Sequence, residues 1–166
     1  PIKSSAASDV YKRQELKGAP ETFDAEAMYA LIKETKGSDT WWPVYDRNLH
    51  EPLKYRLHIT GSILLVEGNY LLLDEKPYRS LSALCDYCVF IQAEENLLRD
   101  RLIDRKSRGG LSKEQAEVFY EKSDRCNVQR VLHNRLNSDE VWKLCTDGGY
   151  RLISRSFDES WQTFCE

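Results

Sequence analysis

The stretch Ile-Leu-Leu-Val-Glu-Gly-Asn-Tyr-Leu-Leu-Leu-Asp, residues 63–74, predicts the centre of the fold. Its first four residues are all aliphatic, so a strand formed by them has no polar face and must be covered on both sides, as in a parallel sheet flanked by helices. Glu67 and Gly68 follow directly. A carboxylate just beyond a buried strand lies where open α/β sheets bind ligands, a position that suits metal or phosphate chemistry. The alternative is a glutamate that only leads the chain from the sheet into solvent.

Length and charge limit the class of protein. The chain has 166 residues and a mass of 19.4 kDa, which fits one domain with a sizeable core. Its 24 basic and 27 acidic residues give a net charge of −3, which does not call for a nucleic-acid partner. No apolar run has transmembrane length, no signal-peptide pattern occurs, and the five cysteines are odd in number and scattered. We therefore expect a cytoplasmic protein with reduced thiols and no membrane partner.

The first residues differ in character from the rest. Residues 1–14 have little apolar content and no helical or strand period. Residues 4–14, Ser-Ser-Ala-Ala-Ser-Asp-Val-Tyr-Lys-Arg-Gln, resemble translated adapter sequence at the broken end of an assembled read. We expect a foreign or disordered leader over 1–14 and a partial domain over 15–166.

A second notable stretch mixes aromatic and charged side chains. Residues 41–50 read Trp-Trp-Pro-Val-Tyr-Asp-Arg-Asn-Leu-His, and the proline excludes a helix there. An irregular segment with aromatics, an acid, a base and a histidine is typical of a pocket for a polar ligand. The alternative is an aromatic flap over the core with its charges in solvent.

A basic helix is predicted over residues 94–106. Between Arg99 and Arg108 there are five basic and two acidic residues, and Arg101 and Arg105 project from one face because they are four residues apart. Such charges usually form a solvated face with i,i+4 pairs to Asp100 and Asp104. The diglycine at 109–110 favours a mobile lid that closes guanidinium groups over an anion.

The remaining elements follow from local signals. Asp24 is a suitable N-cap for a helix that ends at Gly37, and residues 112–115 form a capping box that opens a long helix reaching residue 132. We predict strands over 57–59 and 87–92 and a last strand within 139–153, and short helices over 78–84 and 157–164.

Four motifs in this order resemble the P-loop kinases of the uridine kinase, phosphoribulokinase and pantothenate kinase group. They are Gly-Ala-Pro-Glu-Thr-Phe-Asp (18–24), Pro-Val-Tyr-Asp-Arg (43–47) with His50, Leu-Leu-Val-Glu-Gly-Asn-Tyr-Leu-Leu-Leu (64–73) and Arg-Leu-Ile-Asp-Arg-Lys (101–106). The nucleoside or sugar kinase-like branch is the most similar. The resemblance implies an α/β fold with a three-layer parallel sheet flanked by helices, and transfer of the γ-phosphoryl group of ATP to a hydroxyl of a small metabolite such as a nucleoside, sugar or pantothenate-like compound.

The resemblance also implies roles for single residues. Glu67 would hold Mg²⁺ through water or contact the acceptor, and Arg105 would act with it in catalysis. The acceptor pocket would be lined by Tyr45, Asp46, Arg47 and His50. The lid over the ATP phosphates would contain Arg101, Arg105 and Arg108. Phosphoryl transfer depends mostly on positioning and on neutralising charge, for which Mg²⁺ and arginine are suited.

The sequence departs from this family at the nucleotide site. No G-x-x-x-x-G-K-[ST] motif occurs, and the segment that carries the family's likely general base, an aspartate, is absent as well. We therefore expect the first strand, the P-loop and the first helix to be missing, and the chain to be inactive alone although its parent is a kinase. The alternative is a non-catalytic relative that binds a metabolite or a partner. A nucleic-acid binder fits poorly because the net charge is negative, and the sequence does not decide between a monomer and a homodimer.

Overall fold

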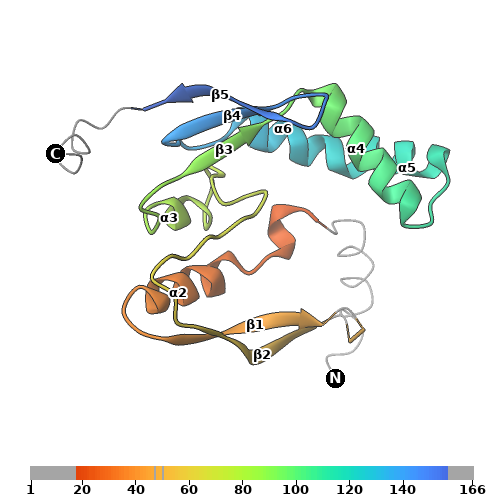
Figure 1. Ribbon diagram of the computed structural model, residues 1–166. Coiled ribbons are helices and arrows are strands. Elements are labelled where there is room, and N and C mark those ends of the chain that lie inside the picture. The colour runs from red at the N-terminus through yellow and green to blue at the C-terminus, as the bar shows by residue number, and fades with distance from the viewer. Residues whose placement is uncertain (1–17, 47, 50, 157–166) are drawn as a thin grey trace.

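The computed structural model describes residues 18–46, 48–49 and 51–156. Its elements, shown in Figure 1, are in chain order η1 (Pro20–Thr22), α2 (Ala25–Thr35), β1 (Thr40–Asp46), β2 (Glu51–Ile59), α3 (Arg79–Ser82), β3 (Val89–Gln92), α4 (Glu95–Arg108), α5 (Lys113–Phe119), η2 (Tyr120–Asp124), α6 (Arg125–His133), β4 (Glu140–Leu144) and β5 (Tyr150–Arg155). The chain is a mixed α/β protein with two separate sheets. The predicted leader and the predicted helix over 157–164 lie outside the described residues.

Helix α2 packs against a two-stranded antiparallel sheet. The predicted N-cap is confirmed, because the Asp24 carboxylate accepts a hydrogen bond from the amide of Ala27 at 2.9 Å. At the other end of the helix, the Trp42 indole donates to the hydroxyl of Thr35 at 2.9 Å. That hydroxyl also lies 2.8 Å from the hydroxyl of Thr40 on β1. These contacts fix the hairpin to the carboxyl end of α2.

The prediction of an irregular segment over 41–50 was wrong for most of its length. Residues 40–46 form β1, which pairs with β2, and the pairing register shifts between Trp42 and Val44. Pro43 lies at this shift. A proline is tolerated in a strand at a bulge, where its missing N–H breaks no ladder bond, so one proline did not exclude a strand here.

The second sheet has the order β3-β4-β5. Strands β3 and β4 are parallel, as predicted for an α/β fold, and α4, α5, η2 and α6 lie between them in the sequence. Strand β5 is antiparallel to β4, so the predicted last strand within 139–153 is two strands joined by a turn. Within the described ranges, parallel pairing is limited to β3 and β4.

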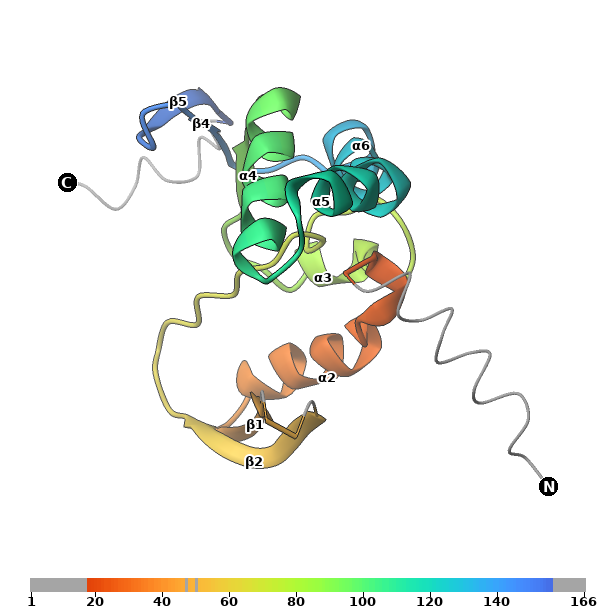
Figure 2. The same ribbon diagram turned by 90° about the vertical axis from the view of Figure 1, so that its right-hand side faces the viewer.

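The prediction of a buried central strand over 63–66 was wrong for this structure. These residues have no strand structure, and Ile63 and Leu65 are each 91% exposed. Figure 2 shows this part of the chain as the yellow coil that leads from β2 towards the helices. A strand needs hydrogen-bonded neighbours, and in the described residues neither the β1-β2 sheet nor the β3-β4-β5 sheet pairs with 63–66. The predicted burial of 87–92 was also mostly wrong, since only Phe90 of β3 is buried.

Two small cores hold the elements together. One joins α2 to residues 70–84 and contains Ala25, Ile32, Tyr70, Leu73, Tyr78 and Leu81. The other joins α4 to α5 and η2 and contains Ile103, Ala116 and Tyr120. In Figures 1 and 2 the hairpin and the α4–α6 helices lie at opposite ends, with α2 between them. No helix in the described part of the chain is both long and apolar enough to span a membrane.

Candidate functional site

An open pocket of about 1030 Å³ lies between the turn at residues 18–22 and the helices α5, η2 and α6. We call it the candidate pocket. Its lining combines an apolar wall with acidic, basic and amide groups, the mixture that binds polar small molecules. The lining residues are Ala19, Glu21, Leu111, Glu114, Gln115, Val118, Phe119, Lys122, Ser123, Cys126, Asn127 and Arg130.

Two buried tyrosines hold the turn that forms one wall of the pocket. The Tyr70 hydroxyl donates to the carbonyl oxygen of Gly18, and the Tyr78 hydroxyl donates to that of Pro20, each at 2.5 Å. Burial raises the pKa of Tyr70 to about 12 and also raises the pKa of Tyr78. Both hydroxyls therefore stay protonated at neutral pH and remain donors to the turn.

Arg130 on α6 joins two distant acidic residues at the edge of the pocket. Its Nε donates to Glu75 Oε1 at 2.7 Å, and its terminal nitrogens bond Glu75 Oε2 and, at 2.6 Å, Glu21 Oε1. We call this group the Arg130 clamp (Arg130, Glu75 and Glu21). Its hydrogen bonds lower the pKa of both carboxyl groups and raise the pKa of Arg130. At neutral pH the guanidinium and both carboxylates are charged, so the clamp carries a net charge of −1.

A polar cluster lies behind the same pocket wall. Lys106 Nζ on α4 is 3.5 Å from Asp124 Oδ2 and 3.4 Å from the ring centre of Phe119, which lines the pocket. Asp124 ends η2, a π-helical turn, and such turns occur frequently at functional sites. Within the described ranges, Asp124 Oδ2, the Tyr120 hydroxyl and the Ser107 hydroxyl are buried without a hydrogen-bond partner.

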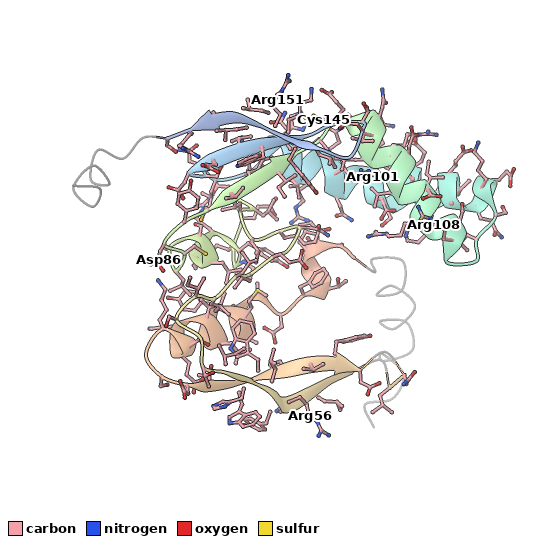
Figure 3. The ribbon with its side chains drawn as sticks, viewed as in Figure 1. Arg56, Asp86, Arg101, Arg108, Cys145 and Arg151 are labelled. Carbon is pink, nitrogen blue, oxygen red and sulfur yellow. The ribbon has the colours of Figure 1, made fainter. Side chains whose placement is uncertain are left out.

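The predicted lid arginines differ in their surroundings, although all three are exposed on α4. Arg108 forms an i,i+4 ion pair with Asp104, which lowers the pKa of that carboxyl group. The side chains of Arg101 and Arg105 form no hydrogen bond or ion pair with any described residue. Figure 3 shows Arg101 along the helix and Arg108 near its end. The turn after α4 uses Gly110 at a φ of 105°, which favours glycine, and leads to Leu111 at the pocket.

The predicted acceptor residues lie elsewhere. Tyr45 and Asp46 are at the end of β1, in the hairpin at the other end of the molecule from α4. The Asp46 carboxylate accepts hydrogen bonds from the amides of Asn48 and Leu49 at 2.8 and 3.0 Å. Arg47 and His50 lie outside the described residues. The structure thus does not bring Tyr45 and Asp46 together with the α4 arginines, and their role in acceptor binding stays a prediction.

Glu67 is exposed in the coil that follows residues 63–66. It forms no hydrogen bond or ion pair with a described residue, so its carboxylate is available to a ligand. No three His, Cys, Asp or Glu side chains gather as metal ligands in the described part of the chain. A single available carboxylate fits the mode in which Mg²⁺ is bound mainly by substrate phosphates and water.

Several residues of this site were not found from sequence. Glu21 lies within the motif at 18–24, but neither Glu21 nor Asn127 was predicted as a site residue. The pairing of Arg130 with Glu75 and Glu21 spans 55 and 109 residues of sequence. A single sequence has no local signal for such distant pairs. The i,i+4 spacing of Arg130 and Asn134, which both bond Glu75, is a weak signal that these two side chains lie on one face.

The chain is similar to proteins named as kinases, although no protein-family model matches it. It is 29% identical to an ATP-dependent kinase-like protein, notR', of Aspergillus versicolor, over 90% of this chain and 88% of that protein. It is also 29% identical to a protein provisionally named a uridine kinase in Schizosaccharomyces pombe, over 78% of this chain and 58% of that one. The uncharacterized protein YggC of Escherichia coli is 40% identical over 146 residues, which are 88% of this chain and 62% of YggC.

A solved structure gives the same result for the fold. A protein from Silicibacter sp. TM1040, provisionally named a fructose transport system kinase, matches with a TM-score of 0.73 and 27% sequence identity. The match covers 81% of this chain and 66% of that chain, so this chain spans less than two thirds of YggC and of the solved relative. The chain is thus kinase-like in both sequence and fold, and these matches support a relation to the P-loop kinases.

Proposed function

We propose that the whole protein transfers the γ-phosphoryl group of ATP to a hydroxyl of a small metabolite of the nucleoside, sugar or pantothenate-like class. The observation that carries this proposal is the match to a kinase-named solved structure over 81% of the chain. The relatives named as kinases support the same reaction type and differ in the acceptor that their names state. The acceptor therefore remains open among these three classes.

Helix α4 supplies the phosphate-binding charges in this proposal. Arg101 and Arg105 are exposed and have no partner among the described residues, so binding an anion breaks no ion pair. Arg108 must first leave Asp104, which makes it the weaker candidate. Guanidinium groups placed against the transferring phosphoryl oxygens stabilise the charge of the transition state, and this is the main form of catalysis in phosphoryl transfer.

The reacting hydroxyl is assigned to the candidate pocket. Leu111, which follows the turn after α4, lines it, so the pocket and the basic helix are neighbours in the chain. The acceptor role of Tyr45, Asp46, Arg47 and His50 is a separate proposal, since Tyr45 and Asp46 lie in the hairpin and do not line this pocket. Glu67 would hold Mg²⁺ through water, and the ion would supply positive charge to the ATP phosphates. A cytoplasmic location remains part of the proposal, whereas the choice between a monomer and a homodimer is left open.

A second candidate function follows from the absence of a G-x-x-x-x-G-K-[ST] motif in this sequence. The chain would then be a metabolite- or partner-binding module without catalysis. The two functions differ in their response to ATP. A module binds its metabolite equally well with and without ATP and releases no ADP, whereas a kinase releases ADP only in the presence of its acceptor.

The experiment is a coupled ADP-release screen with the protein expressed from its complete reading frame. Nucleosides, sugars and pantothenate are offered singly with ATP and Mg²⁺. We expect acceptor-dependent ADP release with one class, and a strong loss on Glu67→Gln. Acceptor binding without ADP release in any combination would support the binding module instead.

A further inference from the structure

We propose that Arg130 is a positioning residue that fixes the turn at residues 18–22 as a wall of the candidate pocket, and that Glu21 on this wall hydrogen-bonds a hydroxyl-bearing acceptor. The inference rests on the proposed function for the nature of the ligand. The role of Arg130 in fixing the wall does not depend on it.

The geometry places Arg130 between three separate parts of the chain. The guanidinium makes two parallel hydrogen bonds to Glu75, in the loop that precedes α3, and a third to Glu21 in η1. Asn134, one turn further along α6, donates to Glu75 Oε1 at 2.8 Å and accepts from the amide of Asp74 at 3.0 Å. Glu75 is thus held twice by α6, and it in turn orients the guanidinium towards Glu21.

Glu21 differs from Glu75 in exposure. The Glu21 side chain is 55% exposed and lines the pocket, whereas the Glu75 side chain is 28% exposed. The inner carboxylate anchors the arginine, and the outer one remains open to solvent at the pocket wall. A carboxylate is an acceptor-only group, so it favours hydroxyl donors. It repels anions, and two carboxylates around one guanidinium leave a negative charge at this wall.

The clamp requires the shape of arginine. A guanidinium presents its N–H groups in one plane and can bond two carboxylates at once, whereas a lysine ammonium is a point charge on a flexible stem. Arg130→Lys keeps the charge and loses the planar fork. We therefore expect it to hold Glu75 and to release Glu21.

The test measures amide exchange in the turn and the KM of the acceptor separately. Hydrogen exchange followed by mass spectrometry reports the Thr22 and Phe23 amides, which bond the carbonyl oxygens of Ala19 and Pro20 within the turn. We expect at least tenfold faster exchange of these amides in Arg130→Met, Glu21→Ala and Arg130→Lys, because each variant loses the bond between residue 130 and Glu21. Glu21→Ala keeps the Arg130–Glu75 bonds, so it tests the wall even if Arg130→Met fails to fold. The control is Arg151→Met on β5, an exposed arginine whose side chain forms no hydrogen bond or ion pair with a described residue, and for it we expect no change.

Steady-state kinetics then test whether Glu21 on this wall binds the acceptor. With the acceptor from the ADP-release screen, we expect Glu21→Ala and Arg130→Lys to raise the acceptor KM at least tenfold with the ATP KM unchanged. Unchanged exchange in both Arg130→Met and Glu21→Ala overturns the proposal, as does faster exchange with an unaltered acceptor KM. If the wild-type protein phosphorylates no acceptor, the proposed function is wrong, and the exchange measurement alone decides the role of Arg130.

Discussion

The Arg130 clamp makes the free energy of unfolding depend on pH. Both carboxyl groups have pKa values below their usual value of 4.5 because Arg130 donates hydrogen bonds to them. A carboxyl group with a lowered pKa in the folded state contributes stability above its unfolded pKa, and this contribution is lost as the pH falls through the folded pKa. The clamp therefore stabilises the fold at neutral pH and is lost in acid below pH 4.5.

The first prediction follows from this direction of the pH dependence. Arg130→Met should lower the free energy of unfolding by about 2 kcal/mol at pH 7, because it leaves a partly buried carboxylate without its partner. Urea unfolding at pH 7 and near pH 3 should show that the difference between variant and wild type shrinks in acid. Arg151→Met serves as the control, and an equal difference at both pH values would contradict the role of the clamp.

Local side-chain contacts were predictable from sequence, and distant ones were not. The Asp24 cap and the capping box at 112–115 lie within four residues of their partners, and both are confirmed. The tyrosines that hold the 18–22 turn lie 52 and 58 residues from it in sequence, and the two carboxylates of the clamp lie 55 and 109 residues from Arg130. Their pairing depends on the folded arrangement of three segments, which no local pattern specifies.

At the level of elements, the capping box fixes the start of α5, which carries part of the pocket wall. The Ser112 hydroxyl accepts from the amide of Gln115 at 3.2 Å, and the Gln115 side chain accepts from the amide of Ser112 at 2.9 Å. Both bonds satisfy amide groups that a helix start otherwise leaves to water.

The second prediction concerns this helix start. Ser112→Ala should lower the free energy of unfolding by about 1 kcal/mol, the usual cost of losing such a cap. The matched control is Ser80→Ala, since Ser80 is exposed and its hydroxyl bonds no described residue. Thermal and urea unfolding of the two variants measure the difference. Equal stabilities would show that the cap contributes nothing.

Elements with a local period were predicted better than those that depend on neighbours. The helices over 94–106 and 113–132 were confirmed because their capping and apolar spacing are local, although the π-helical turn at 120–124 had no signal. The strand over 63–66 was predicted from its apolar residues alone. A strand also requires adjacent strands, and none of the described strands pairs with it. Conversely, β1 formed despite Pro43 because the bulge accommodates it.

At the scale of the molecule, Ile63 and Leu65 are exposed to solvent, and among the described strands β3 is an unpaired edge of its sheet. Ile63 and Leu65 are 91% exposed, and β3 at the sheet edge exposes Val89 and Ile91 by 45% and 54%. Unpaired strand edges and exposed apolar side chains promote association. The arrangement therefore predicts that this chain on its own self-associates.

The third prediction tests this surface. Replacing Ile63 and Leu65 together by lysine should reduce self-association of the chain, as measured by sedimentation velocity at several concentrations. Lysine at Thr60 and Ser62 adds the same charge to the same segment and keeps both apolar side chains, so this control should still associate. Equal association of the two double variants would show that charge alone governs it, and a monomeric parent chain would refute the prediction outright.

The central claim is that the unpaired arginines of α4 handle phosphate in a phosphoryl transfer reaction. The most direct measurement compares ADP release by Arg105→Ala and Arg151→Ala in the protein expressed from its complete reading frame. Loss of a charge that stabilises the transition state should lower kcat by about a hundredfold or more in Arg105→Ala. Arg151→Ala removes an arginine from β5 that is also exposed, and this variant should keep wild-type turnover. Equal turnover of the two variants, or no ADP release by the wild type with any acceptor, would contradict the claim.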